Sequence, residues 1–182
     1  MKKGIITGTI FLVIGIGAYI AYRVLSSRQL SPAQTITQSY QGLDITLVYC
    51  RPSKKGRLIF GEAKDGALVP YGQYWRMGAN DATEITFSKD VNFSDKLLRA
   101  GRYRMYAVPN ELTWTISFNS ELGKWGFDPP NYSLDVLKID VPVETLQTAT
   151  EQFSIKFKND STGVIMNVDW DKTRLSVPIR LQ

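Results

Sequence analysis

The sequence contains no histidine and only one cysteine, Cys50. The absence of histidine excludes a Ser-His-Asp triad, a Cys-His nucleophile and a histidine-ligated metal. A lone cysteine excludes an intrachain disulfide and a zinc site built from cysteines. Cys50 also lacks a histidine that would activate its thiol. From these residue types we predict no catalytic residue, no metal site and no cofactor.

Acidic residues are absent from the first 28 positions, which hold Lys2, Lys3, Arg23 and Arg28. The whole chain carries 22 basic and 17 acidic residues, a net charge of +5, so the rest of the chain holds 18 basic and 17 acidic residues. A basic protein often binds nucleic acid. Here the excess charge flanks an apolar segment, and we predict no nucleic-acid partner.

Charge is also absent from the 19 residues between Gly4 and Tyr22. A helix of this length spans about 28 Å, which matches the hydrocarbon thickness of a bilayer. We therefore predict an N-terminal transmembrane anchor over residues 1–23 that contacts the membrane through residues 4–22. The alternative is a cleaved signal peptide, whose apolar region is usually about 7–15 residues long. Whether the segment is retained or removed stays open.

The charges that flank the apolar run set the expected orientation. Lys2, Lys3 and the terminal amine slightly outweigh Arg23 and Arg28, which favours a cytoplasmic N-terminus. The expected location is the bacterial inner membrane, with a single span and the C-terminal domain in the periplasm. Residues 24–32 are small and polar and end at a proline, so we expect a short linker there.

Helical periodicity is absent after Pro32, and apolar residues recur at every second position instead. Leu43, Ile45 and Leu47 alternate with polar neighbours, and similar patterns recur up to residue 181. About nine or ten short strands without helical crossovers predict an all-β, antiparallel β-sandwich, jelly-roll-like, over residues 33–182. The alternate positions, such as Arg104 and Tyr106, are expected to face water. The Thr-rich stretch 144–152 is expected to form a loop or one turn.

Regular alternation is missing from residues 50–84, a segment rich in glycine. Within it, residues 51–76 hold six basic residues against Glu62 and Asp65. Long irregular segments in compact domains are usually functional or mobile. Arginines suit carboxylates and phosphates, aromatic rings suit stacking, and Asn or Asp side chains orient polar ligands. The candidate ligand-binding residues are Arg51, Arg57, Tyr71, Trp75, Arg76, Asn80 and Asp81.

A structural role is the competing interpretation of the same residues. An arginine of this segment paired with Asp81 or Glu84 and covered by Trp75 would form a clamp that holds the loop to the sandwich. Asn80 and Asp81 would then simply make a turn. Asp169 and Asp171 resemble carboxylate metal ligands, but they fit a solvated strand edge more simply.

Several motifs of this segment form a recognisable signature. They are Arg51-Pro52, Lys55-Gly56-Arg57, Ile59-Phe60-Gly61, Leu68-Val69-Pro70-Tyr71-Gly72 and Trp75-Arg76-Met77-Gly78-Ala79-Asn80-Asp81-Ala82-Thr83. With these motifs the chain resembles, from about residue 31 to its C-terminus, a bacterial family of exported proteins known as domain of unknown function 2911. The resemblance implies an envelope location and no particular activity.

These observations predict a membrane-anchored extracytoplasmic β-sandwich that binds a ligand or a protein partner through residues 51–84. One alternative is a carboxylate-based hydrolase that uses Asp81 or Glu84. The other alternative is a structural subunit of an envelope complex, docked by its helix and its sheet edges. The residues favour binding over catalysis, so we do not expect an enzyme.

Overall fold

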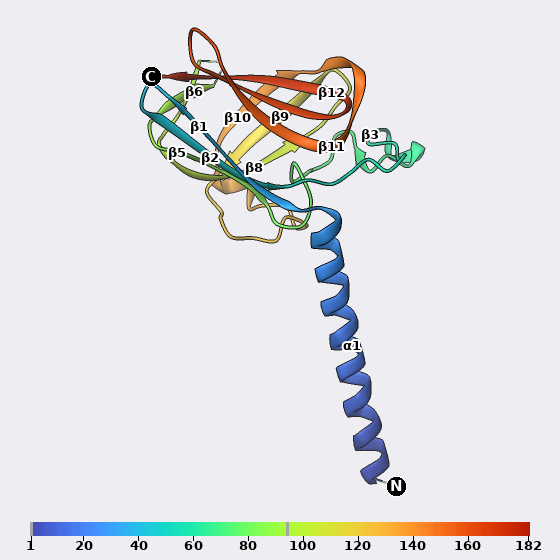
Figure 1. The fold of residues 1–182 in the computed structure, drawn as a ribbon. Helices are drawn as coiled ribbons and strands as arrows, with labels where there is room; N and C mark the ends of the chain where they lie inside the picture. The colour runs from blue at the N-terminus through green and yellow to red at the C-terminus, as the bar shows by residue number, and fades with distance from the viewer. Residues whose placement is uncertain (1, 94) are drawn as a thin grey trace.

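A computed structural model describes the backbone of residues 2–93 and 95–182 and the side chains of residues 12–93 and 95–182. One long helix, α1 (Lys2–Leu30), stands away from a body made of strands (Figure 1). The helix therefore includes residues 24–30, which we expected to form a linker. No proline or glycine interrupts these residues, and the hydroxyls of Ser26 and Ser27 donate to backbone oxygens one turn earlier. Only Ser31 and Pro32 connect α1 to the first strand.

No helical stretch of the described residues combines the length and the apolar character that a membrane crossing requires. The predicted span, residues 4–22, begins with residues 4–11, whose side chains lie outside the described part. The predicted membrane anchor therefore stays a prediction.

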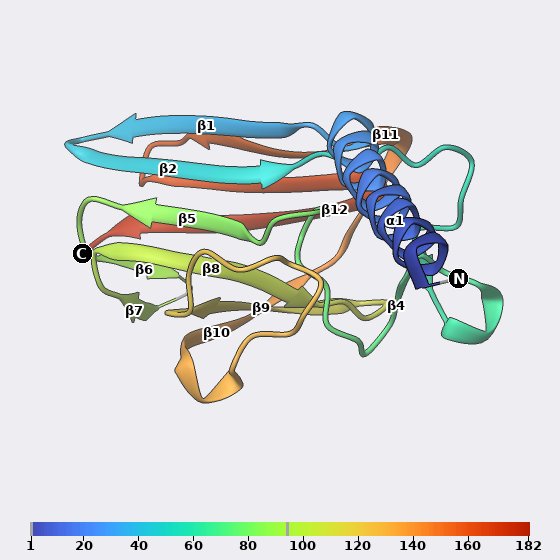
Figure 2. The ribbon, with the colours of Figure 1, turned by 90° about the horizontal axis from the view of Figure 1, so that it is seen from below.

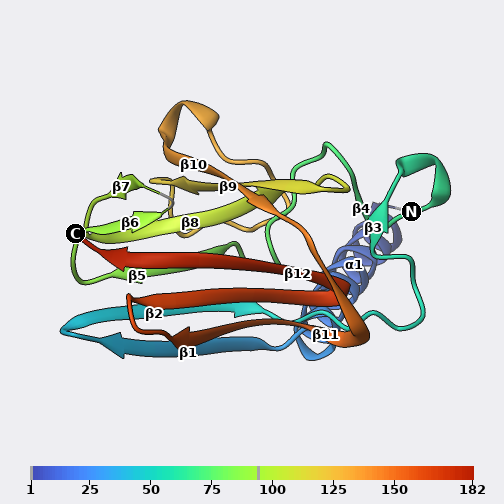
Figure 3. The same ribbon diagram turned by 90° about the horizontal axis from the view of Figure 1, so that it is seen from above.

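Two antiparallel sheets pack face to face to form the body (Figure 3). The prediction of an all-β, antiparallel fold is confirmed. The six-stranded sheet contains, in spatial order, β1 (Ala33–Tyr40), β2 (Leu43–Cys50), β5 (Thr83–Phe87), β8 (Gly101–Val108), β9 (Thr113–Asn119) and β10 (Asp135–Pro142). The four-stranded sheet contains β11 (Glu144–Asn159), β12 (Val164–Leu181), β6 (Val91–Phe93) and β7 (Lys96–Leu98).

The edges of the two sheets meet on both sides of the sandwich. The Gln38 side chain on β1 donates to Asn159 on β11 at 3.0 Å, and Lys96 on β7 donates to the backbone oxygen of Lys138 on β10 at 2.9 Å. These contacts cover edge strands that would otherwise expose unpaired backbone groups. Hairpins and a β8–β9–β10 meander supply most neighbours within the sheets. A jelly roll is built from two Greek keys, so that part of our prediction is wrong.

Alternating apolar residues from both sheets fill one core, as their period of two requires. On β2, for example, Leu43, Ile45 and Leu47 are buried. Each such side chain contributes about 1.5–3 kcal/mol when it leaves water. One end of the core is aromatic and contains Phe60, Trp75, Trp114, Phe153 and Trp170.

The outer face of the six-stranded sheet is not all wet, contrary to our expectation. Residues 120–134, with the short 3-10 helix η2 (Tyr132–Leu134), cross over it and bury Arg104, Tyr106 and Asn119. The burial of these polar side chains is tolerated because each makes hydrogen bonds to nearby residues. Tyr106 donates to Asp135 at 2.7 Å, and Asn119 donates to the backbone oxygen of Asn131 at 2.9 Å.

The stretch 144–152 is extended rather than a loop or a turn, which corrects a further expectation. It forms the first half of β11, and its pairing with β12 shifts register between Thr145 and Thr150 and again between Thr150 and Ser154. Such bulges insert unpaired residues and break the alternation of faces. The sequence pattern therefore hides a strand that the β-branched threonines favour.

Residues 51–82 form the irregular excursion that the sequence predicts. They contain only β3 (Phe60–Gly61), the 3-10 helix η1 (Ala63–Asp65) and β4 (Val69–Pro70), with β3 and β4 paired in parallel. Figure 2 shows the excursion at the same end of the sandwich as α1. This placement brings the candidate loop next to the last turn of the helix.

Candidate functional site

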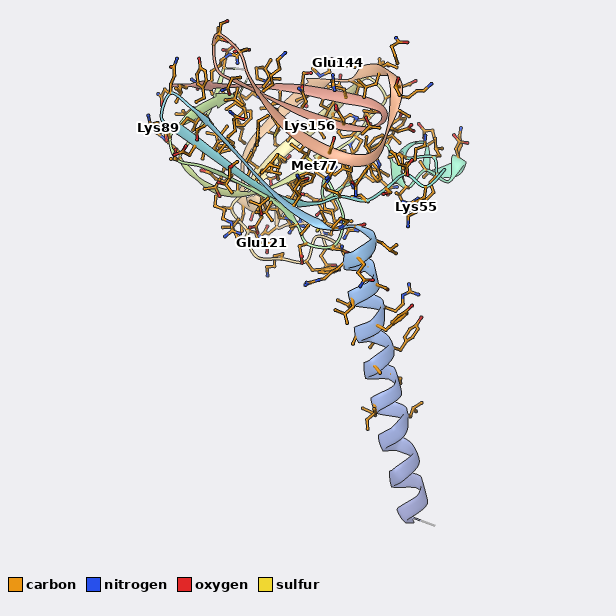
Figure 4. All side chains as sticks on the ribbon, viewed as in Figure 1. Lys55, Met77, Lys89, Glu121, Glu144 and Lys156 are labelled. Atoms are coloured by element: carbon orange, nitrogen blue, oxygen red, sulfur yellow. The ribbon has the colours of Figure 1, made fainter. Side chains whose placement is uncertain are left out.

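A pocket of about 440 Å³ opens between the irregular excursion, the end of α1 and β12. Its apolar surface comes from Leu30, Pro52, Leu68, Val69, Trp75 and Trp170. Its charged side chains are Lys55, Arg57 and Arg76. Figure 4 shows Lys55 near the end of α1, whereas Lys89 lies at the opposite end of the sandwich. Apolar walls with a few polar groups are the usual form of a small-molecule site.

All three charged side chains of the pocket are cationic, and no described carboxylate lines it. The described ion pairs of the chain involve other lysines and arginines. The contrast is sharpest between neighbours, because Lys54 pairs with Asp171 at 2.5 Å while Lys55 has no such partner among the described residues. The nearest carboxylate in the hydrogen-bond pattern, that of Glu151, accepts from the backbone amide of Lys55 at 2.8 Å and makes no ion pair with the Lys55 ammonium. Among the described residues, the three cations of the pocket therefore have no ion-pair partner.

Arg76 is the most enclosed of the three cations. Its guanidinium is half-buried, with one long contact of 3.5 Å from Nη1 to the backbone oxygen of Asn80 and the ring of Phe127 at 5.9 Å. Burial lowers the pKa of Arg76 from its ordinary value, because low-polarity surroundings disfavour the charged form. Tyr74, Cys50 and Arg104 also act on this pKa, and none of them is a carboxylate. An incoming anion would offset this unpaired charge.

Arg57 is held by the backbone of its own loop. Its Nε donates to the oxygen of Lys54 at 3.0 Å, and its Nη2 donates to the oxygen of Ser53. These two bonds fix the direction of the guanidinium at the pocket wall. A guanidinium that is already held in one orientation loses less conformational entropy when it binds a carboxylate or a phosphate.

Trp75 forms one side of the pocket and belongs to the core at the same time. Its ring stacks on Trp170 of β12 at 5.8 Å, with 18° between the planes. Its backbone pairs with Ala107 of β8 on the opposite sheet. The rings are only 6 % and 2 % exposed, so they offer a rigid edge rather than an open stacking face. Trp75 therefore shapes the pocket, and we assign its main contribution to packing.

Asn80 lines the pocket, but its amide is already engaged. Nδ2 donates to the backbone oxygens of Ser27 and Ser31, each at 3.3 Å. The last carbonyls of a helix have no partner within the helix. The Ser27 oxygen also accepts from the backbone amide of Ser31 at 3.1 Å, so the Asn80 amide is a second donor to it. Asn80 thus caps α1 and joins the helix to the loop.

The backbone around Asn80 adopts unusual conformations. Met77, Gly78 and Asn80 all have positive φ, of 52°, 151° and 56°. A Cβ on Gly78 would lie 2.7 Å from the backbone oxygen of Cys50, so only glycine fits. The backbone that Gly78 approaches so closely is that of Cys50 at the end of β2. Strained segments of this kind concentrate at functional sites.

Three of the seven predicted site residues lie outside the pocket. Arg51 donates from Nε to the backbone oxygen of Phe153 at 3.3 Å, in a separate hollow between β1 and β11. Tyr71 lies where the carboxylates of Glu62 and Glu111, together with burial, raise its pKa. Asp81 pairs with Arg28 of α1 at 3.8 Å. The pocket therefore unites Arg57, Trp75, Arg76 and Asn80.

The clamp interpretation predicts an arginine of the loop on Asp81 or Glu84. The structure places other arginines there, since Asp81 meets Arg28 and Glu84 meets Arg102 at 2.5 Å. Glu84 also accepts a hydrogen bond from the backbone amide of Gly123 at 2.7 Å. Neither carboxylate lines the pocket, and two different cations hold them. This placement does not support an acid–base pair.

Asp169 and Asp171 of β12 are likewise paired with cations. Arg174 donates to both carboxylate oxygens of Asp169 at 2.7 Å, and Asp171 meets Lys54. Within the part of the chain that the structure describes, no group of three metal-ligating side chains comes together.

A second polar cluster lies under residues 120–134. Arg104 is only 1 % exposed and donates from Nη2 to the hydroxyl of Tyr74 at 2.6 Å. Its nearest carboxylate, Glu121, lies 3.5 Å away, and its Nε has no partner among the described residues. The Tyr74 hydroxyl in turn donates to the backbone oxygen of Gly126 at 2.8 Å. The cluster ties residues 120–134 to the sheet beside the pocket.

Sequence reasoning did not single out several other contributors to the pocket. Ser27 and Leu30 come from the end of α1, Trp170 comes from β12, and Lys55 comes from the predicted loop. The charge count of residues 51–76 gave a signal for Lys55. No local pattern indicates that a distant helix end and a C-terminal strand meet at this loop.

The comparisons with known proteins point to one family. No curated protein and no solved structure matches this chain. A family model matches residues 31–179, which include β1 to β11, all but the last two residues of β12 and all the pocket residues except those of α1. The chain belongs to the family described as Protein of unknown function (DUF2911).

Proposed function

We propose that the chain is a membrane-tethered binding module whose sandwich lies in the periplasm of a bacterial cell and binds a ligand in the pocket beside α1. The observation that supports this proposal most strongly is the set of three unneutralised cations, Lys55, Arg57 and Arg76, around one pocket with apolar walls. Arg76 is half-buried, and unpaired charge at such a position costs free energy unless a partner arrives. Lys55 and Arg57 are exposed to solvent and add positive charge beside it.

The exposed surface of α1 supports the tether. Leu12, Val13, Ile14, Ile16 and Ile20 are all more than half exposed, and the helix projects away from the sandwich (Figure 1). Apolar side chains on all sides of a helix are unfavourable in water and favourable in lipid. We propose that residues 4–22 lie in the bilayer.

Aromatic side chains beside the end of α1 give the tether a second support. Trp125 is 41 % exposed and Phe127 is 70 % exposed, and the backbone of Trp125 bridges to Asp81, which pairs with Arg28 of α1. Figure 2 shows residues 120–134 on the same side of the sandwich as the helix. Such side chains favour the interface between lipid and water. In our proposal this loop rests on the membrane surface.

The fluorescence of Trp125 provides a test of the proposed membrane contact. The other three tryptophans are buried, so lipid-borne quenchers at headgroup depth reach this ring first. The full chain is reconstituted into phosphatidylcholine vesicles that contain a lipid with a nitroxide quencher on its headgroup. The proposal predicts flotation with the vesicles and quenching that Trp125→Phe removes. A chain that stays in the aqueous fraction would contradict the tether.

Pocket binding is tested separately by native mass spectrometry of the full chain purified from membranes. The proposal predicts a bound small molecule that is lost from Arg76→Gln and kept in Arg99→Gln. Arg99 is an exposed arginine paired with Asp90 at 2.7 Å on the β7–β8 turn, so it controls for loss of one charge. Equal occupancy in both variants would contradict the assignment of the pocket.

A further inference from the structure

The chemistry of the pocket narrows its ligand, provided that the proposed binding function holds. Its three cations come from two neighbouring stretches of the excursion, Lys55 with Arg57 and then Arg76. No described carboxylate lines the pocket, and that of Glu151 is engaged by the backbone amide of Lys55. Three positive charges suit a group that carries up to two negative charges and offers several acceptor oxygens, as a phosphate ester does.

The opposite wall of the pocket is apolar. Leu30 and Leu68 are exposed enough to contact a ligand, and the buried Pro52, Val69, Trp75 and Trp170 form the floor. Apolar side chains of this kind gain free energy when a hydrophobic body displaces water from them. An inorganic ion would leave this wall uncovered.

We infer that the pocket binds an amphiphilic phosphate ester, with the phosphate between Arg57, Arg76 and Lys55 and the apolar body against Leu30 and Leu68. The fixed guanidinium of Arg57 sets the orientation of the phosphate. The phosphate also neutralises the half-buried guanidinium of Arg76.

The place of the pocket in the fold bears on the source of this ligand. Ser27, which lines the pocket, lies five residues after Tyr22, or about 8 Å along the helix. If residues 4–22 occupy the hydrocarbon core, that distance puts the pocket beside the headgroup layer. Both a lipid headgroup and a soluble phosphate ester carry the required chemistry, and the experiment separates them.

The test is calorimetric titration of the full chain in nanodiscs of phosphatidylcholine. The probes are hexyl phosphate, inorganic phosphate and hexanol, which present the whole ligand chemistry, the anion alone and the apolar body alone. We expect hexyl phosphate to bind about tenfold more tightly than either of the other probes. We expect Arg76→Gln to weaken hexyl phosphate about tenfold or more and Arg99→Gln to leave it unchanged.

Nanodiscs that contain phosphatidylglycerol separate the two sources. If a lipid headgroup occupies the pocket, these nanodiscs weaken hexyl phosphate binding to wild type and leave the residual binding to Arg76→Gln unaffected. If the ligand is soluble, both nanodisc compositions give the same affinity. Either result supports the inference.

Two outcomes overturn the inference and differ in what they say of the binding function. If hexanol binds as tightly as hexyl phosphate and Arg76→Gln has no effect, the ligand is not a phosphate ester, but the pocket still binds a ligand. No saturable binding of any probe rejects both. Circular dichroism of each variant checks that the strands are intact before titration.

Discussion

The side-chain amide of Asn80 donates a hydrogen bond of 3.3 Å to the backbone oxygen of Ser31, directly after the last residue of α1. A second bond from the same amide reaches Ser27. The residue that joins the helix to the sandwich therefore also lines the pocket. In the proposed membrane setting, Asn80 fixes the distance between the bilayer and the ligand site.

Asn80→Asp is expected to loosen this junction. An aspartate keeps the left-handed backbone conformation at φ 56°, but it has no donor and places a negative charge on the two carbonyls. Losing the donors to these carbonyls costs about 1–3 kcal/mol. Hydrogen exchange should show faster exchange of the amides around residues 27–31.

Asn92→Asp is the matched control, because Asn92 on β6 makes no side-chain hydrogen bond within the described residues. It should leave exchange at the helix end unchanged. Equal protection of residues 27–31 in wild type and Asn80→Asp would show that Asn80 does not hold the junction.

Gly78→Ala is expected to destabilise the fold and distort the pocket. The new methyl would lie 2.7 Å from the oxygen of Cys50, at a φ of 151°. Strain of this kind costs about 1–3 kcal/mol, before the clash is added. Gly56→Ala offers a control, since its φ of 70° is also positive but nothing lies within 4 Å of the new methyl. Urea unfolding should give a clearly larger loss for Gly78→Ala, and equal losses would contradict the close contact with Cys50.

The Tyr106 hydroxyl should make the protein sensitive to alkali. Burial, and then the hydrogen bond to Asp135, raises the pKa of Tyr106 above its usual value. The folded state then keeps a proton that the unfolded state releases above about pH 10. The stability that the protonated Tyr106 hydroxyl contributes is complete below that pH and is lost as pH rises further. Urea unfolding of wild type and Tyr106→Phe between about pH 8 and about pH 11 should show a shallower decline of the unfolding free energy for the variant. Parallel declines would contradict this role.

Much of the sandwich follows from the sequence, because apolar residues recur at every second position along β2, β8, β9 and β12. The prediction fails where tertiary contacts override that period. Arg104 and Tyr106 look solvent-facing in the pattern, but residues 120–134 cover them. The bulges after Thr145 and Thr150 conceal the first half of β11.

Part of the candidate site was also predictable from the sequence. The irregular, basic segment identifies Arg57 and Arg76 as candidates, since composition alone marks it as unlike the scaffold. Arg51 and Asp81 share that composition, yet the fold directs them to the Phe153 backbone and to Arg28. Whether a charged residue of this segment forms an ion pair depends on contacts with distant segments. No local sequence pattern indicates those contacts.

The thermal stability of Arg76→Gln, with and without hexyl phosphate, tests the central claim most directly. A binding guanidinium without a carboxylate partner contributes little to folding, so the variant should melt within about 2 °C of wild type. At about 100 times its Kd for wild type, the probe should raise the Tm of wild type by about 5–10 °C and that of the variant by at most about half as much, because the variant binds the probe about tenfold or more weakly. If Arg76→Gln instead melts well below wild type and the probe shifts neither protein, Arg76 is a structural clamp and the pocket is not a binding site.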